Sequence, residues 1–143
     1  MKAVIGRVVS LALGLLTIGV CAGRAQILNQ VDFKMSEPFT VANTTLPAGS
    51  YIIRPVAGTD SMVLEIVSAN GHPAVMVDAN SAQTDSAQSG SHLVFNKYHN
   101  VLALSQVFPG GGNTGYQLAQ GHPEQLAAKA EKPTKQTVGS NAK

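Results

Sequence analysis

The stretch HLVFNKYHNVLALSQVF, residues 92–108, decides the fold. Two runs rich in aliphatic and aromatic side chains, residues 92–97 and 101–108, flank a polar reversal at Tyr98-His99-Asn100. Apolar runs of this length, separated by a short polar segment, are typical of paired strands. The stretch therefore predicts an antiparallel hairpin.

The same kind of pattern continues toward the amino terminus. Val31, Phe33 and Met35 alternate with polar residues at the period of a half-buried strand. Asn70-Gly71 separates two further apolar runs, and this dipeptide is a strong signal for a tight hairpin turn. The predicted strands are residues 31–35, 39–41, 51–54, 62–67, 74–77, 92–97, 101–108 and 116–118. They predict an all-β fold, an antiparallel sandwich or small barrel of about seven to eight strands.

The carboxyl-terminal part has a different composition. Residues 26–119 form the predicted β-domain, and a short helix is expected only over residues 120–132. Pro123 suits a first helical position, and Glu124 suits the first helical turn. The polar residues 133–143 have almost nothing to bury, which predicts a disordered tail.

The amino terminus has the three parts of an export signal. Lys2 and Arg7 supply positive charge, residues 8–20 are mainly apolar, and small residues precede Gln26. The apolar run is shorter than the roughly 20 residues that a membrane span needs. Residues 1–25 are therefore predicted to be a cleavable signal peptide, which makes the mature chain periplasmic or secreted.

Two alternatives to simple cleavage stay open. The apolar run could be kept as an uncleaved membrane anchor. The chain could instead be cut at Cys21 and lipid-anchored there, although Val20 is bulky at a position where that processing wants a small residue.

Cleavage also changes the charge of the chain. The whole sequence carries a formal net charge of +2, but loss of Lys2, Arg7 and Arg24 leaves seven basic and eight acidic residues, a net charge of −1. Without a basic stripe, the mature chain is not predicted to bind nucleic acid or an anionic membrane surface. Loss of Cys21 leaves no cysteine, so the core alone must hold the fold together.

The segment Gly110-Gly111-Gly112-Asn113-Thr114-Gly115 formally matches the G-x-G-x-x-G dinucleotide fingerprint. That motif binds a pyrophosphate only where a helix begins at its end. Tyr116-Gln117-Leu118 is predicted to be a strand instead, so the motif is interpreted as a flexible connection or bulge. No cofactor is predicted.

The four histidines do not form a metal-ligand pattern. His72 and His122 precede prolines, and His92 and His99 would lie about 20 Å apart on one hairpin. No pair has the spacing of zinc ligands on a strand or a helix. They are interpreted as exposed loop histidines, and no metal site is predicted.

No arrangement of residues specifies catalysis. Ser89-Gly90-Ser91-His92 lacks the glycine pattern of a nucleophile elbow. Glu65 alternates with Leu64 and Ile66, so its side chain is expected to face water. The chain is therefore predicted not to be an enzyme, with a small secreted hydrolase that uses a histidine or Glu65 as an alternative.

Two polar segments are the predicted working surfaces. Residues 78–91 contain no large apolar side chain, and residues 109–115 are rich in glycine, so both are interpreted as exposed loops. The candidate interaction residues are Asp78, Asn80, Gln83, Asp85, Gln88, Gly110, Gly112 and Asn113. They predict a structural or binding component of the bacterial envelope or extracellular space, whose partner is an unknown envelope protein or ligand. A small-ligand carrier with an apolar barrel cavity is the other alternative.

Three separated segments form one further set. They are PFTV at residues 38–41 leading to LPAGSY at 46–51, LVFNKY at 93–98 with LSQV at 104–107, and GYQL at 115–118 with Glu124. Together they resemble an uncharacterised family of small exported β-rich proteins found largely in acidobacteria, over most of residues 31–131. The sequence departs from that family at Phe108, where a tryptophan or similar large aromatic residue is expected. The resemblance implies an envelope or secreted β-domain and carries over no catalytic or ligand residue.

Overall fold

The structure is a computed structural model that describes residues 30–58, 62–86, 89–110 and 112–140. The predicted signal peptide, residues 1–25 with Cys21, lies outside these residues, and so do Gln88 and Gly111.

The described residues form ten strands and one helix. The strands are β1 (Val31–Met35), β2 (Phe39–Val41), β3 (Thr44–Leu46), β4 (Gly49–Pro55), β5 (Val63–Ser68), β6 (Pro73–Gln83), β7 (His92–Lys97), β8 (Leu102–Phe108), β9 (Thr114–Leu118) and β10 (Thr134–Gly139). Helix α1 spans His122–Ala130, inside the predicted range 120–132. The predicted all-β class with one short helix is confirmed, and β3 and β10 are the strands that the sequence patterns missed.

These strands belong to one mixed sheet that is not closed. Its main path runs in the order β1-β4-β5-β6-β9-β8-β2-β3, and β7 pairs with both β8 and β10. The predicted hairpin is present, because β7 and β8 pair antiparallel from His92 opposite Phe108 to Lys97 opposite Leu102. Strands β2 and β8 pair in parallel. The open sheet excludes the closed barrel, and the parallel pair makes the sheet mixed rather than purely antiparallel.

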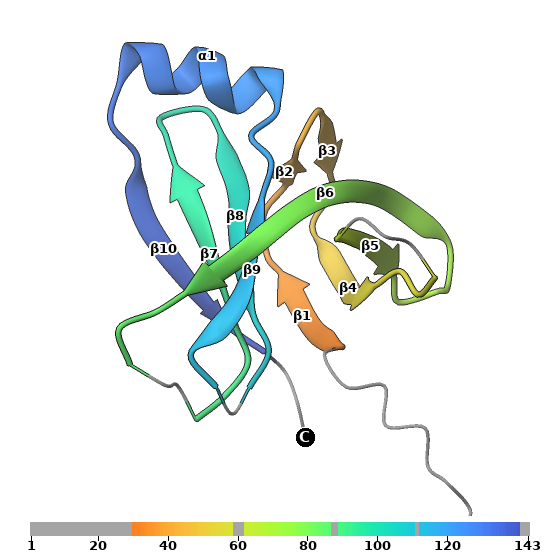
Figure 1. Cartoon of the computed structure of the whole chain (residues 1–143). Coiled ribbons are helices and arrows are strands. Elements are labelled where there is room, and N and C mark those ends of the chain that lie inside the picture. The colour runs from red at the N-terminus through yellow and green to blue at the C-terminus, as the bar shows by residue number, and fades with distance from the viewer. Residues whose placement is uncertain (1–29, 59–61, 87–88, 111, 141–143) are drawn as a thin grey trace, which may run out of the picture.

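Strand β6 links the two halves of the sheet. Its residues 73–78 pair with β5, and its residues 79–83 pair with β9. The strand curves across the molecule between these two partners (Figure 1). The loop predicted over residues 78–91 is therefore wrong over its first part. Backbone ladder bonds do not need large apolar side chains, and the small side chains of Ala79 and Ala82, one on each face of the strand, are both buried.

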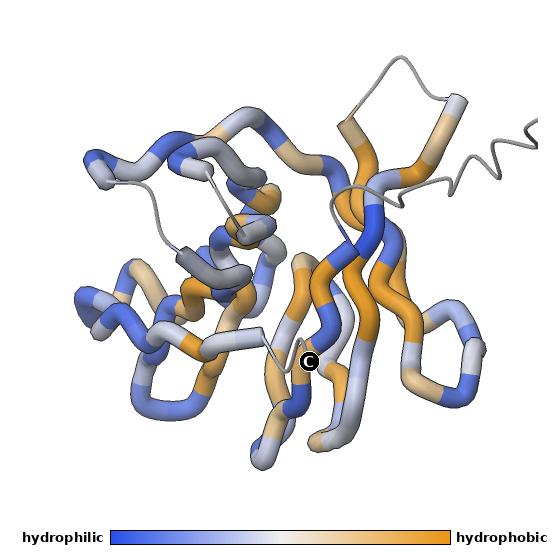
Figure 2. Tube along the Cα trace, turned by 90° about the horizontal axis from the view of Figure 1, so that it is seen from below, coloured by the Kyte–Doolittle hydropathy of each residue, from blue (hydrophilic) through white to orange (hydrophobic). Residues whose placement is uncertain are grey.

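Four aromatic rings hold the two halves together. Phe33 and Tyr51 come from the paired strands β1 and β4, whereas Phe39 and Phe95 come from β2 and β7. The ring centroid of Phe39 lies 5.8 Å from that of Phe33, 5.2 Å from that of Tyr51 and 5.9 Å from that of Phe95. These distances favour aromatic pairing beyond simple burial. Figure 2 shows the hydrophobic segments gathered in the strands and the hydrophilic ones in the turns.

Helix α1 is fastened at its amino-terminal end to the β2–β3 turn. The N–H of His122 donates to Oδ1 of Asn43 at 2.8 Å, so a residue far away in the sequence caps the helix. Gly121 lies so close to this turn that a Cβ atom on it would be 1.8 Å from the carbonyl oxygen of Ala42. The missing side chain at Gly121 therefore allows the helix to dock.

Strand β10 contradicts the predicted disordered tail over residues 133–143. Residues 134–139 pair antiparallel with the whole of β7, and Nζ of Lys135 donates to Oδ1 of Asn96 at 2.6 Å. The strand is largely exposed, although Val138 packs against the core. The prediction considered apolar burial alone, whereas hydrogen bonding to β7 satisfies the backbone of this segment.

Candidate functional site

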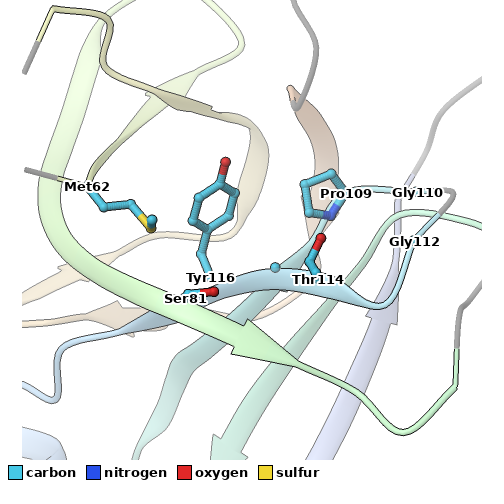
Figure 3. A pocket seen from close by; sticks show the side chains of 8 residues that line it. Met62, Ser81, Pro109, Gly110, Gly112, Thr114 and Tyr116 are labelled. Carbon is cyan, nitrogen blue, oxygen red and sulfur yellow. The ribbon is translucent and has the colours of Figure 1, made fainter.

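A surface pocket lies where β6, β9 and the β8–β9 connection meet. Its volume is about 380 Å³. The residues that line it are Met62, Ser81, Pro109, Gly110, Gly112, Thr114, Gly115 and Tyr116. In Figure 3 the ring of Tyr116 stands in the middle, with Met62 on one side and Pro109 on the other. We name this feature the Tyr116 pocket.

The Tyr116 pocket lies at the outer end of the sheet face that packs against the core. Ser81 and Tyr116 are cross-strand partners, two residues beyond the buried pair of Ala79 and Leu118. Side chains two apart on a strand share one face, so both pairs lie on the core side. Tyr116 is half-buried and packs against the core cluster. The pocket is therefore supported by well-packed side chains beneath it.

The structure brings the two predicted working segments together beside this pocket. The N–H of Thr84 donates to the carbonyl oxygen of Asn113 at 2.8 Å. The N–H of Gly110 donates to Oγ of Ser91, also at 2.8 Å. Gly110 and Gly112 line the pocket. The polar segment after β6 and the glycine-rich segment before β9 are thus neighbours in space.

The other candidate residues that the structure describes do not line the pocket. Asp78, Asn80 and Gln83 lie on β6 with exposed side chains, and Asp85 is exposed beyond the end of that strand. Gln88 is not among the described residues. The pocket lining therefore includes Gly110 and Gly112 from the candidate residues and Ser81 from the predicted loop over residues 78–91.

Sequence reasoning missed Met62 and Tyr116 as site residues, because both were assigned to strands. It placed Ser81 in the predicted loop over residues 78–91 without naming it as an interaction residue. The pocket forms only because β6 pairs with β9 and brings the three segments together. The one local signal was the position of Tyr116, directly after the glycine-rich segment.

Gly115 is explained by packing within the sheet. A Cβ atom on it would lie 2.4 Å from the carbonyl oxygen of Val107 and 2.5 Å from a ring carbon of Phe108. The glycine-rich motif that contains Gly115 runs into strand β9, as predicted. A dinucleotide site would need a helix at this point. The glycine therefore allows β9 to approach β8 closely.

The described residues that line the Tyr116 pocket carry no charged side chain. Met62 and Pro109 present apolar surface, and the side chain of Met62 is 43 % exposed. Ser81, Thr114 and Tyr116 carry hydroxyl groups that can donate and accept hydrogen bonds. Such a lining suits a neutral group that is apolar on one side and polar on the other.

The four histidines lie apart from one another, and the prediction that they are exposed loop residues is wrong for His92. His72, His99 and His122 are exposed, whereas His92 is buried at the start of β7. The ring of His92 stacks on that of Phe108, its cross-strand partner, with centroids 4.9 Å apart. Within the described part of the chain, no three His, Cys, Asp or Glu side chains form a group that could hold a metal ion.

The residues considered for hydrolysis make structural contacts. Glu65 was expected to face water, but its side chain is only 15 % exposed, and its Oε2 accepts from Nε of Arg54 at 2.8 Å. The two are cross-strand partners on β5 and β4. Oγ of Ser91 accepts a hydrogen bond from the N–H of Gly110, and this bond holds the glycine-rich segment in place. Neither Glu65 nor Ser91 lines the Tyr116 pocket.

Glu124 is a buried carboxylate, 3 % exposed, on the first turn of α1. Its Oε1 accepts from Nδ2 of Asn96 at 2.6 Å, from Nε2 of Gln120 at 3.3 Å and from the hydroxyl of Tyr98 at 3.5 Å. Burial and then the nearby Glu124 charge raise the pKa of Tyr98 above its ordinary value of 10.0. These contacts join α1 to the end of β7, so we assign the cluster to the fold.

The fold and the pocket define a small β protein with an open mixed sheet and a neutral surface pocket. Comparison of the chain with models of protein families finds no match. Comparisons with curated proteins and with solved structures find none either. Among the described residues there is no helix whose length and apolar character would suffice to cross a membrane.

Proposed function

We propose that this chain is an exported, non-enzymatic β-domain that serves as a binding component of the bacterial envelope or extracellular space, and that it binds through the Tyr116 pocket. One observation carries the proposal: both predicted working segments converge at this pocket. Gly110 and Gly112 line it, and the backbone of Asn113 holds Thr84 beside it. Surface segments on a rigid sheet can change without cost to the core, which suits them to binding. Export rests on the sequence pattern of residues 1–25.

A small-ligand carrier is the first alternative. Its cavity would have to lie between the two halves of the sheet. The side chains of Phe33, Phe39 and Phe95 are fully buried there and contact one another or Tyr51. This packing argues for a ligand held at the rim, where the Tyr116 pocket lies, rather than in an interior cavity.

A secreted hydrolase is the second alternative, and it has less support. Glu65 is paired with Arg54, and His92 is stacked on Phe108. Catalysis would need an acid, a base or a nucleophile to share one cleft. Glu65 and His92 are thus held by other contacts, and His72, His99 and His122 are exposed and do not line the Tyr116 pocket.

Site-specific photo-crosslinking in native cells tests the proposed function. A photoreactive amino acid replaces Met62 in the pocket, and in a matched chain it replaces Met76, which is 61 % exposed and lies outside the pocket lining. We expect a discrete crosslinked product from position 62 that is missing from position 76. Equal products, or no product at either position, would overturn the pocket as the binding surface.

A second pair of variants tests whether binding at the pocket needs the Tyr116 ring. Tyr116→Ser removes the ring in the middle of the pocket, whereas Leu126→Ser changes a side chain on α1 that is 52 % exposed. Tyr116→Ser should abolish the product formed from position 62, and Leu126→Ser should leave it. Far-UV circular dichroism establishes that both variants are folded.

A further inference from the structure

The backbone groups of β6 alternate between its two edges, as in any strand of an antiparallel ladder. On the β9 side, the carbonyl oxygen of Asp78 accepts from the N–H of Ala119 at 3.1 Å. On the β5 side, the N–H of Ala79 donates to the carbonyl oxygen of Met62 at 2.9 Å. Even-numbered residues in this part of β6 therefore face β9, and odd-numbered residues face the opposite edge.

Ser81 and Gln83 are the odd-numbered residues that follow Ala79 on β6. Their backbone N–H and C=O groups point away from β9, at the edge that continues past the amino-terminal end of β5. No strand formed by the described residues pairs with β6 at this edge. Such a row of backbone donors and acceptors is a template for an added strand.

The Tyr116 pocket lies directly beside this edge. Ser81 lines the pocket and stands opposite Tyr116 on β9. On an added strand, the residue paired with Ser81 would place its side chain on the same face, next to Ser81 and Tyr116. Met62 flanks that position in Figure 3. Because the described lining residues are uncharged, an uncharged side chain fits there.

We propose that the partner is an extended peptide segment of another protein. It adds as a strand to the edge of β6 at Ser81 and Gln83 and places an uncharged side chain in the Tyr116 pocket. This inference rests on the proposed function, because it names the partner of the same pocket. Backbone groups at strand spacing recognise another backbone, so they select a polypeptide over a sugar or a lipid. In strand addition, main-chain hydrogen bonds supply affinity and side-chain pockets supply specificity.

The first test uses the mature chain and short synthetic peptides in which threonine alternates with leucine, phenylalanine or glutamate. Fluorescence anisotropy measures their affinities. We expect the leucine or phenylalanine peptides to bind and the glutamate peptides not to bind. N-methylation of alternate peptide nitrogens should weaken binding roughly tenfold in one set and leave it unchanged in the other, because only alternate N–H groups face β6.

The second test changes the protein. Ser81→Pro removes an N–H that points away from β9, so the ladder with β9 keeps its bonds. Thr137→Pro is the matched control: the N–H of Ser140 donates to Ser91 at 2.9 Å, which places Thr137 among the outward-facing residues of β10. We expect Ser81→Pro to weaken peptide binding roughly tenfold and Thr137→Pro to leave it unchanged. If Ser81→Pro fails to fold, the N-methylated peptides test the same bonds with the unaltered chain.

Three outcomes would overturn the inference. They are the absence of binding by every peptide, an equal effect of N-methylation in both sets, and a dimer of the native chain that Ser81→Pro dissociates, which would make a second copy the occupant. If the peptides fail while Tyr116→Ser still abolishes crosslinking from position 62, the proposed function stands with a different kind of ligand. If crosslinking fails as well, both proposals fall.

Discussion

At the residue scale, Gly121 meets the β2–β3 turn with no side chain between them. In Gly121→Ala the new Cβ would lie 1.8 Å from the carbonyl oxygen of Ala42, far inside contact distance, so helix α1 must shift. We expect the free energy of unfolding to fall by about 2 to 3 kcal/mol. Gly139→Ala is the control, because its Cβ would meet nothing within 4 Å and the change should stay under about 0.5 kcal/mol. The chain has no tryptophan, so denaturation followed by circular dichroism measures both variants. Equal losses would contradict this account of the docking.

The ionisation of Tyr98 makes the stability of the fold depend on pH. Burial and the Glu124 carboxylate raise the pKa of Tyr98 above 10.0 in the folded chain. The neutral hydroxyl is therefore favoured by folding. Its contribution is complete below pH 10 and is lost as the pH rises through the folded-state pKa.

The variant Glu124→Gln separates the Glu124 charge from burial and the Glu131 charge, which also raise the pKa of Tyr98. It removes the negative charge and leaves the burial, so we expect the pKa of Tyr98 to fall toward 10.0 without reaching it. Titration of the tyrosine ring signals by nuclear magnetic resonance measures the change. Tyr51 is the internal reference, since burial alone raises its pKa. An unchanged Tyr98, or an equal change at Tyr51, would speak against a role for the Glu124 charge.

At the element scale, β10 covers the outer edge of β7. Deleting residues 133–143 should lower the free energy of unfolding by roughly 2 kcal/mol, since each ladder hydrogen bond contributes about 1 kcal/mol and the released tail regains entropy. The deletion also leaves β7 as an unpaired edge, so sedimentation should show self-association. A chain that ends at Ser140 keeps β10 and serves as the control. If both truncated chains match the full chain in stability and association, β10 is dispensable.

Elements held by local signals could be predicted, and the others could not. The β7–β8 hairpin and the turn at Asn70-Gly71 follow from apolar runs and turn residues that are close together in the sequence. Strand β10 and residues 79–83 of β6 carry small or polar side chains and take their strand structure from a neighbouring backbone. Composition alone cannot reveal such strands, because every residue except proline has the same backbone donor and acceptor.

At the scale of the whole molecule, the export prediction concerns residues 1–25. We expect the protein recovered from fractionated native cells to have an intact mass that begins at Gln26, in a soluble fraction. A lipid adduct that begins at Cys21, or an uncut chain in membranes, would contradict simple cleavage. Either result would make the protein an anchored component and direct the search for its partner to the membrane.

The candidate site also combines residues that local sequence patterns predict with residues that only the pairing of distant strands brings together. Its glycine-rich segment was predicted as a working surface, and Gly110 and Gly112 do line the Tyr116 pocket. Met62 was not predicted, and Ser81 lay in the predicted loop over residues 78–91 without being named, because both join the pocket only through the pairing of β6 with β5 and β9.

By itself, the sequence determined the all-β class, eight of the ten strands and the position of the helix, because alternation, turn residues and helix caps act between near neighbours in the chain. Only the tertiary structure decided that the sheet stays open, that β6 serves both halves, and that Gly121 docks α1 on the β2–β3 turn. The Tyr116 pocket belongs to this second group, and so does the β6 edge with which no strand of the described residues pairs. Each depends on backbone pairing between distant segments, and local side-chain patterns do not show which distant segments pair.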